Sequence, residues 1–234
     1  MAELTDALLF YVAFVFSVTL HEAGHAWAAL RLGDPTAYHG GQVSIDPMPH
    51  IRREPIGMVV LPLMTVVLSG WPFGYASAPY DPRWAQRHPK RAAWMALAGP
   101  AANAVLLLIA ALLIRTGVGM GSLEAPQSVW LTQVVVASGP PGSLASGSAY
   151  LLSAFFTMNL VLLLLNLIPV PPLDGSGALP LLLPDHWAAR YRELCARPGF
   201  ALIGILIAWT IFGKILMPTF VVAVNLLYPG SYYG

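Results

Sequence analysis

The chain has 234 residues, of which 57% are hydrophobic and only 10% are charged. An ordinary soluble domain carries roughly 25% charged residues, and a soluble domain this apolar could not cover its surface with polar groups. The formal net charge of +1 provides no basic surface for nucleic acid, and a single cysteine excludes a disulfide framework. The composition therefore predicts a polytopic membrane protein that resides in a lipid bilayer and binds no nucleic acid.

Membrane spans need about 20 mostly apolar residues. Four regions meet this requirement: 8–32, 92–114, 149–170 and 200–228. The first is not a secretory signal peptide, because its start is acidic where such a signal carries Lys or Arg. The last contains Lys214 and Pro218, so it forms either one kinked helix or two segments.

A shorter apolar segment, 56–71, carries Pro62. The connections on both sides of it are basic, as is a later one, 185–197, and together they hold ten of the twelve Lys and Arg residues. Basic connections remain on the cytoplasmic side of a membrane. A segment flanked by two of them is therefore predicted to re-enter the membrane from one side; the alternative is a short true span.

The stretch 40–45 alternates polar and apolar residues between turn formers, which predicts a short strand or hairpin. The expected fold is an all-α polytopic membrane protein with about four to six transmembrane segments. A short β-hairpin or strand would follow the first span, and a re-entrant segment would occupy 56–71.

The first span contains an H-E-x-x-H pattern, with His21, Glu22 and His25. Residues four apart on a helix face the same way, so both imidazoles can bind one metal ion, with the glutamate beside them. The pattern is short and also occurs by chance. Inside a membrane, however, ionisable residues are costly and mark functional sites, and a metal ion is the natural partner for three of them.

A catalytic zinc needs a third protein ligand. The uncharged stretch that includes the third span ends at Asp174, after three prolines that break the helix. This aspartate is expected at the same membrane depth, and on the same side, as the H-E-x-x-H pattern. The alternative is that Asp174 and Gly175 form only a turn where the chain leaves the membrane.

Three motifs together resemble the site-2 protease family of intramembrane zinc metalloproteases. The H-E-x-x-H pattern is followed by G-P-x-x-N at 99–103 and by N-x-x-P-x-x-x-x-D-G at 166–175, in the family's order. The resemblance implies one catalytic Zn²⁺ bound by His21, His25 and Asp174, with Glu22 as the catalytic acid and base. It places Asn103 and Asn166 near the active site, where they either contact substrate or tie helices together.

The resemblance further implies a hydrolase that cuts a peptide bond in or near the transmembrane segment of a single-span membrane protein. The chain would be one transmembrane metalloprotease domain, 1–234, with a core at about 8–176 and a C-terminal membrane region at 198–228. It offers no room for a soluble PDZ or CBS domain. The expected location is the plasma (inner) membrane of a prokaryote, with the active site toward the cytoplasm.

Substrate binding needs a further expectation, because a helical substrate must unwind to expose a peptide carbonyl. Val43 and Ile45 are predicted to lie on a strand edge along which the unwound substrate pairs; a strand that only packs at the interface is the alternative. The competing function is a non-proteolytic zinc-binding membrane protein, such as a transporter or sensor. A transporter needs polar groups across the whole bilayer, whereas here they gather near one side, which favours the protease.

Overall fold

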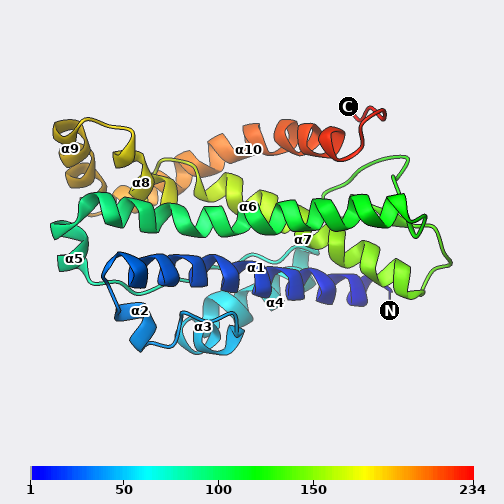
Figure 1. Ribbon diagram of the computed structural model, residues 1–234, viewed down its shortest axis with the longest axis horizontal. Helices are drawn as coiled ribbons and strands as arrows, with labels where there is room; N and C mark the ends of the chain where they lie inside the picture. Colours follow the sequence, from blue (N-terminus) through cyan, green and yellow to red (C-terminus); the bar gives the residue numbers. More distant parts are fainter. Residues whose placement is uncertain (1) are drawn as a thin grey trace.

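The computed structural model describes residues 2–234 of the backbone and the side chains of residues 6–234. Within this part of the chain, four helices are long and apolar enough to cross a membrane: α1 (Ala2–Leu32), α6 (Pro89–Gly119), α7 (Leu144–Asn166) and α10 (Phe200–Leu227). They lie side by side along the long axis of the molecule (Figure 1). The predicted all-α polytopic fold is confirmed, and the last apolar region is a single helix that contains Pro218.

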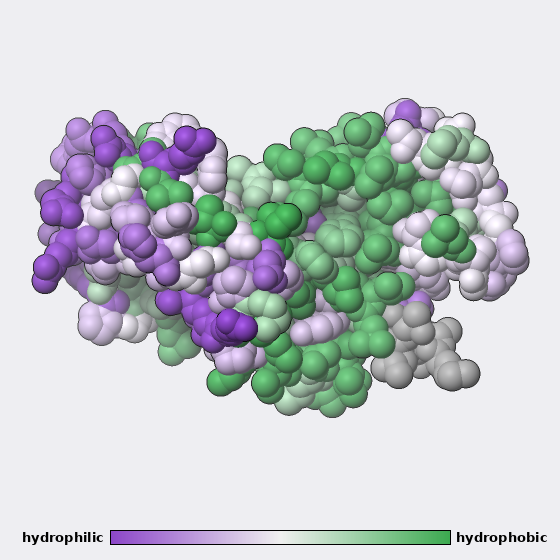
Figure 2. Space-filling view, turned by 60° about the horizontal axis from the view of Figure 1, so that its bottom comes forward, coloured by the Kyte–Doolittle hydropathy of each residue, from purple (hydrophilic) through white to green (hydrophobic). Residues whose placement is uncertain are grey.

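Short elements connect the long helices, and they are α2 (Thr36–His39), α3 (Pro47–Arg53), the π-helix η1 (Ile56–Val60), α4 (Leu61–Ser69), α5 (Pro82–Arg87), α8 (Asp174–Ala178), the 3₁₀-helix η2 (Leu179–Leu181) and α9 (Asp185–Cys195). Figure 1 shows α2, α5, α8 and α9 at one end of the bundle, and both chain termini at the other. We call the first the basic end, because its connections carry most of the Lys and Arg residues. Hydrophilic residues gather there, while the middle is hydrophobic (Figure 2).

The segment that includes η1 and α4 returns to the end where it starts. Gly70, in the left-handed conformation, ends α4, and the chain then runs back in extended form. Tyr75 N donates to Gly57 O at 3.1 Å, and Arg53 Nε donates to Ser77 O at 3.1 Å. Because a Cβ at Gly57 would overlap the Tyr75 carbonyl, this close approach requires glycine. The two ends of the segment lie side by side, which favours the re-entrant interpretation over the short span.

The predicted strand at 40–45 is wrong. The described residues form one sheet, a two-stranded antiparallel pair of β1 (Leu123–Glu124) and β2 (Val136–Ala137), in the connection between α6 and α7. The stretch 40–45 is instead a tight connection between α2 and α3, made of turns and bends. It is held by the buried His50, whose Nε2 donates to Ser44 O at 3.1 Å. The alternating pattern therefore reflects local turns and no sheet.

Packing is strongest among α1, α6 and α7, each of which contacts the other two. One apolar cluster joins α6, α7 and α10, and a second joins α1, α7 and the re-entrant segment. On α1, however, the buried positions after Val15 include polar residues: Ser17, Thr19, His21, Glu22 and His25. Because neighbouring helices shield these groups from lipid, α1 can carry a polar site inside an apolar bundle.

Candidate metal centre

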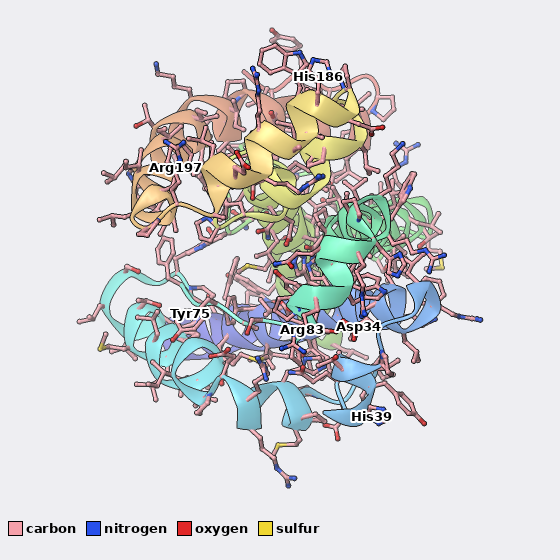
Figure 3. All side chains as sticks on the ribbon, turned by 90° about the vertical axis from the view of Figure 1, so that its left-hand side faces the viewer. Asp34, His39, Tyr75, Arg83, His186 and Arg197 are labelled. Atoms are coloured by element: carbon pink, nitrogen blue, oxygen red, sulfur yellow. The ribbon has the colours of Figure 1, made fainter. Side chains whose placement is uncertain are left out.

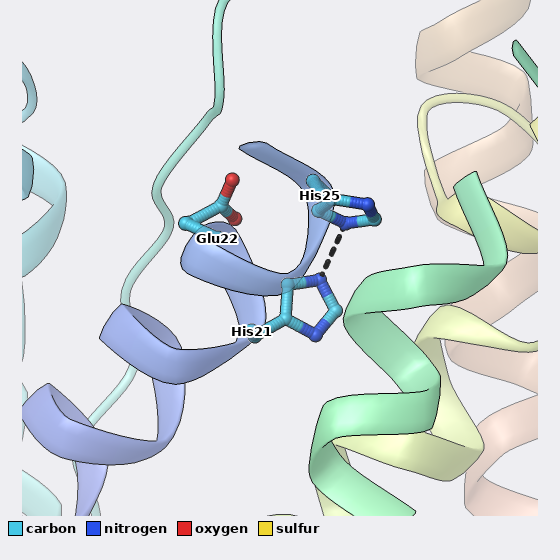
Figure 4. Close-up of side chains that lie close together, drawn as sticks. All are labelled: His21, Glu22 and His25. Atoms are coloured by element: carbon cyan, nitrogen blue, oxygen red, sulfur yellow. Dashed lines mark hydrogen bonds between the residues drawn. The ribbon is translucent and has the colours of Figure 1, made fainter. Parts of the chain in front are cut away.

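His21 and His25 lie one helical turn apart on α1, and their rings face α6 (Figure 4). The two Nε2 atoms are 3.0 Å apart, and the rings meet edge to face with centroids 4.7 Å apart. Both side chains are buried, with exposed fractions of 5% and 7%. The spacing of four residues therefore brings the two imidazoles together, as the sequence predicts.

The outer nitrogen of each ring has its own hydrogen-bond partner. His21 Nδ1 is 2.6 Å from Asn103 Oδ1, and His25 Nδ1 is 2.8 Å from the Met95 carbonyl; both partners belong to α6. Because both partner atoms are oxygens that accept, each Nδ1 carries the hydrogen. In the neutral rings the Nε2 atoms then present lone pairs to each other, which is the arrangement of metal-binding histidines.

Asp174 joins this pair from a distant part of the chain. It is the first residue of α8, and α8 packs against α6 at the basic end. Its Oδ2 lies 3.0 Å from His21 Nε2 and 3.2 Å from His25 Nε2. The structure thus brings together the two histidines and the aspartate that the sequence predicts as ligands, and Asp174 is more than a turn at the membrane exit.

Glu22 lies on the side of α1 away from α6, facing the extended chain that returns from α4 (Figure 4). Glu22, His21 and His25 each offer one possible metal-ligand atom, and these atoms lie within 4.8 Å of one another. Glu22 Oε2 is buried and has no hydrogen-bond partner among the described residues. A glutamate so placed is free to act on a molecule that enters the site.

A cavity of about 800 Å³ reaches this group from the basic end. Glu22, His25 and Asp174 line its inner part, the extended residues 76–80 line one side, and α9 lines the other. Figure 3 looks at this end and shows Tyr75 and Arg83 across from Arg197. The reactive groups are therefore enclosed within the bundle yet reachable by water.

The donor set fits a zinc ion. Two ligands of a tetrahedral zinc, each about 2.0–2.1 Å from it, lie about 3.3 Å apart, close to the separations of 3.0–3.2 Å among the three donor atoms. Asp174 Oδ2 is also buried without a hydrogen-bond partner among the described residues. Three unshared electron pairs that converge in a buried site repel one another, and a cation relieves this repulsion.

Gly99 makes the room that the donor atoms occupy. A Cβ at this position of α6 would overlap the Nε2 atoms of both His21 and His25. The sequence places Gly99 in the G-P-x-x-N motif but does not reveal this role. Met95 leaves no signal in the sequence, because it acts through its backbone carbonyl. α6 thus contributes a hydrogen-bond acceptor to each ring and a gap in front of them.

The four residues expected to contact substrate lie away from the cavity. Asn103 is fully buried behind His21, and Asn166 is half-buried at the end of α7. Val43 and Ile45 lie in the turn-rich connection described above, and none of the four lines the cavity. For Asn103, the geometry supports the alternative that the motif left open, in which it ties helices together. Substrate contact by the other three remains an untested prediction.

Asp34 fixes the basic end of α1 next to the cavity. Its carboxylate accepts hydrogen bonds from Thr36 N at 3.0 Å, from the Thr36 hydroxyl, and from Asp81 N at 2.7 Å. Burial alone would raise the pKa of Asp34, but these hydrogen bonds outweigh burial and lower its pKa below the ordinary value. Because Asp81 caps α5, the carboxylate joins the end of α1 to a wall of the cavity.

Comparisons with known proteins agree with this site. The sequence profile described as Peptidase family M50 matches residues 9–206. YwhC of Bacillus subtilis, which is named as a candidate zinc metalloprotease, is 27% identical over 88% of this chain and 83% of its own length. Rip2 of Mycolicibacterium smegmatis, named in the same way, is 30% identical over 86% of this chain and 66% of its own length. Rip2 of Mycobacterium tuberculosis H37Rv is 31% identical over 83% and 63%.

No solved structure matches the chain. The family match covers most of the sequence and includes the two histidines, the glutamate and the aspartate of the site. These four side chains converge in the structure, within a protein whose helices suit a membrane. The chain therefore belongs to Peptidase family M50, the site-2 protease family of metalloproteases.

Proposed function

We propose that this chain is an intramembrane zinc endopeptidase that cuts a peptide bond in or near the transmembrane segment of a single-span membrane protein. One observation carries the proposal. His21, His25 and Asp174 aim three donor atoms at one point, beside an unpartnered Glu22, at the inner end of a cavity that opens at the basic end.

The chemistry follows from these groups. One Zn²⁺ bound by the two histidines and the aspartate would supply Lewis-acid chemistry, lowering the pKa of water toward about 7 and polarising the substrate carbonyl. Glu22 accepts a proton from the attacking water and returns it to the nitrogen of the leaving amine. Burial among α1, α6 and α8 limits the water that reaches the site to that in the cavity.

The site faces the cytoplasm in this proposal. The cavity opens among the basic connections, and such connections remain on the cytoplasmic side. The relatives named above are bacterial, which supports a plasma (inner) membrane location. A helical substrate would unwind where its chain leaves the membrane, and the extended residues 76–80 leave space for an extended peptide beside Glu22.

Cleavage of model single-span peptides by the purified, zinc-loaded chain in lipid vesicles tests this function. Glu22→Gln keeps the size of the side chain but cannot take up the proton, so we expect cleavage to fall by about 10²–10⁴-fold. Glu124→Gln is the matched control, because Glu124 is exposed on β1 at the other end of the molecule. Equal cleavage by the wild type and Glu22→Gln would contradict the assignment.

The competing function, zinc transport or sensing, makes the opposite prediction. A transporter would move zinc into vesicles and leave the peptides intact. Zinc uptake without peptide cleavage would therefore contradict the protease assignment and support the transporter.

A further inference from the structure

Asn159, a fully buried residue of α7, belongs to no motif recognised in the sequence, yet it connects to the metal centre. Its Oδ1 accepts from Asn103 Nδ2 at 2.8 Å, and Asn103 Oδ1 in turn faces His21 Nδ1 at 2.6 Å. Asn159 Nδ2 donates to the Phe155 carbonyl at 2.8 Å and to Ser17 Oγ at 3.0 Å. The result is one chain of hydrogen bonds from the backbone of α7 to a ring on α1.

The direction of this chain is fixed at its outer end. A carbonyl oxygen only accepts, so the atom of Asn159 that faces Phe155 must be the amide nitrogen. The oxygen of Asn159 then faces Asn103, which must present its own nitrogen there and its oxygen to His21. The contact of Asn103 Nδ2 with Ser17 O supports the same orientation, but at 3.4 Å it is too long to fix the amide alone.

The two histidines differ in how firmly the acceptor of their Nδ1 hydrogen is held in place. His25 Nδ1 donates to the Met95 carbonyl, an acceptor that cannot turn over. His21 depends on an amide, whose two ends are nearly equal in size and opposite in hydrogen bonding. If the Asn103 amide turned over, its NH₂ group would face His21 Nδ1 and favour the ring tautomer with hydrogen on Nε2. That hydrogen would point at His25 and Asp174, where the lone pair is needed for a metal.

We propose that Asn159 is a positioning residue of the metal centre, which holds the Asn103 amide in one orientation and thereby sets the ring tautomer of His21. Asn159 touches neither the substrate cavity nor the donor atoms, so it acts only through Asn103. The proposal rests on the metal site of the proposed function. The helix α7 would then affect zinc affinity in two ways: through Asn159, and through Asp174 in the segment that follows the helix.

Zinc affinity of the full-length purified chain in lipid nanodiscs, measured by competition with a chelator, tests the proposal. Asn159→Leu keeps the approximate volume but removes the hydrogen bonds, and we expect zinc binding to weaken about 10–100-fold, as for other partners that orient metal ligands. Asn225→Leu is the matched control. Asn225 also makes two hydrogen bonds from a membrane helix, but to Tyr233 at the far end of α10, so its loss should leave zinc affinity unchanged.

The variant Asn103→Asp provides a second background, which separates an effect on the orientation of the residue 103 side chain from an effect on helix packing. In Asn103→Asp both side-chain atoms are oxygens, so His21 Nδ1 finds an acceptor whichever way the group turns. Adding Asn159→Leu to Asn103→Asp should then change zinc affinity by less than about threefold. If Asn159 only packs helices together, its replacement costs the same factor in both backgrounds, and that result would overturn the proposal.

Two further comparisons keep the test decisive if Asn103→Asp does not fold, which circular dichroism would reveal. Asn159→Asp, as the neutral acid that a buried site favours, still donates to the Phe155 carbonyl and offers its other oxygen to Asn103 Nδ2, so it should keep most of the affinity. A loss as large as that of Asn159→Leu would refute the mechanism. Normal zinc binding by Asn159→Leu, with binding abolished in His25→Ala, would remove this inference and leave the proposed function intact. A wild-type chain without specific zinc binding would overturn both.

Discussion

The helices α1 and α10 are both long enough to span a membrane, yet they occupy opposite kinds of position. Half of the most apolar stretch of α1 is buried inside the protein, compared with 11% of that of α10. α1 carries the buried polar residues of the site, whereas the buried residues of α10 are Gly204, Ala208, Phe220, Val224 and Leu227. In a membrane, the helix with the polar site must be enclosed by protein, and the more apolar helix can face lipid.

Gly99→Ala gives the largest expected effect, because it tests the enclosure of α1. The added methyl would overlap Nε2 of both histidines, so α6 must move away or the rings must turn. We expect zinc binding to weaken by about 100-fold or more, and peptide cleavage to fall with it. The control is Gly213→Ala on α10, where a Cβ meets no atom within 4 Å. Similar zinc affinities for the two variants would show that α6 does not confine the donor atoms.

Gly204→Ala tests the contact between α10 and the loop that leads to Asp174. A Cβ there would overlap the Pro171 carbonyl, three residues before Asp174. We expect the displaced loop to lower kcat/KM on the order of 10–100-fold, since small displacements of reacting groups have effects of this size. The metal-free protein should remain folded, because α10 packs mainly through its other half. Wild-type kcat/KM for Gly204→Ala would show that α10 does not help to position the loop before Asp174.

Asp34→Asn should have the smallest effect, because it loosens the basic end of α1 without touching a donor atom. The carboxylate accepts three hydrogen bonds, so we expect a loss of about 1–3 kcal/mol in the free energy of unfolding. The lowered pKa of Asp34 also predicts a pH dependence. Its contribution is complete above the ordinary pKa of about 3.9 and is lost as the pH falls through the lower folded-state value.

Thermal unfolding in detergent between pH 2.5 and 6 measures this contribution. The difference in Tm between wild type and Asp34→Asn should be constant from about pH 5 upward and should shrink below about pH 4. A difference that stays the same at the acid end would show that the carboxylate is not held in its charged form.

The sequence predicts the site well where periodicity and charge carry the information. The spacing of His21 and His25 determines that they share a helix face, and the break after α7 predicts where Asp174 leaves the membrane. The basic connections on both sides of 56–71 indicate a segment that re-enters. Each of these inferences depends on local spacing or on a charge count, which tertiary packing does not alter.

Other features depend on contacts between distant segments, and the sequence does not reveal them. The alternation at 40–45 resembles a strand, but the hydrogen bond from His50 folds that stretch back into turns. Met95 acts through its backbone, so any residue at that position could serve. Asn159 lies seven positions before Asn166, which begins the N-x-x-P motif. Only the packing of α7 against α1 and α6 brings Asn159 to Asn103.

Asp174 and the histidine pair are separated by about 150 residues of chain, which include the long helices α6 and α7. A metal held between them therefore closes a loop that contains most of the protein. Membrane helices insert one after another, and the ligand set is incomplete until α7 has docked and α8 has folded beneath it. All three ligands can therefore hold a metal ion only after α7 and α8 are in place, and a partly inserted chain has no complete metal centre.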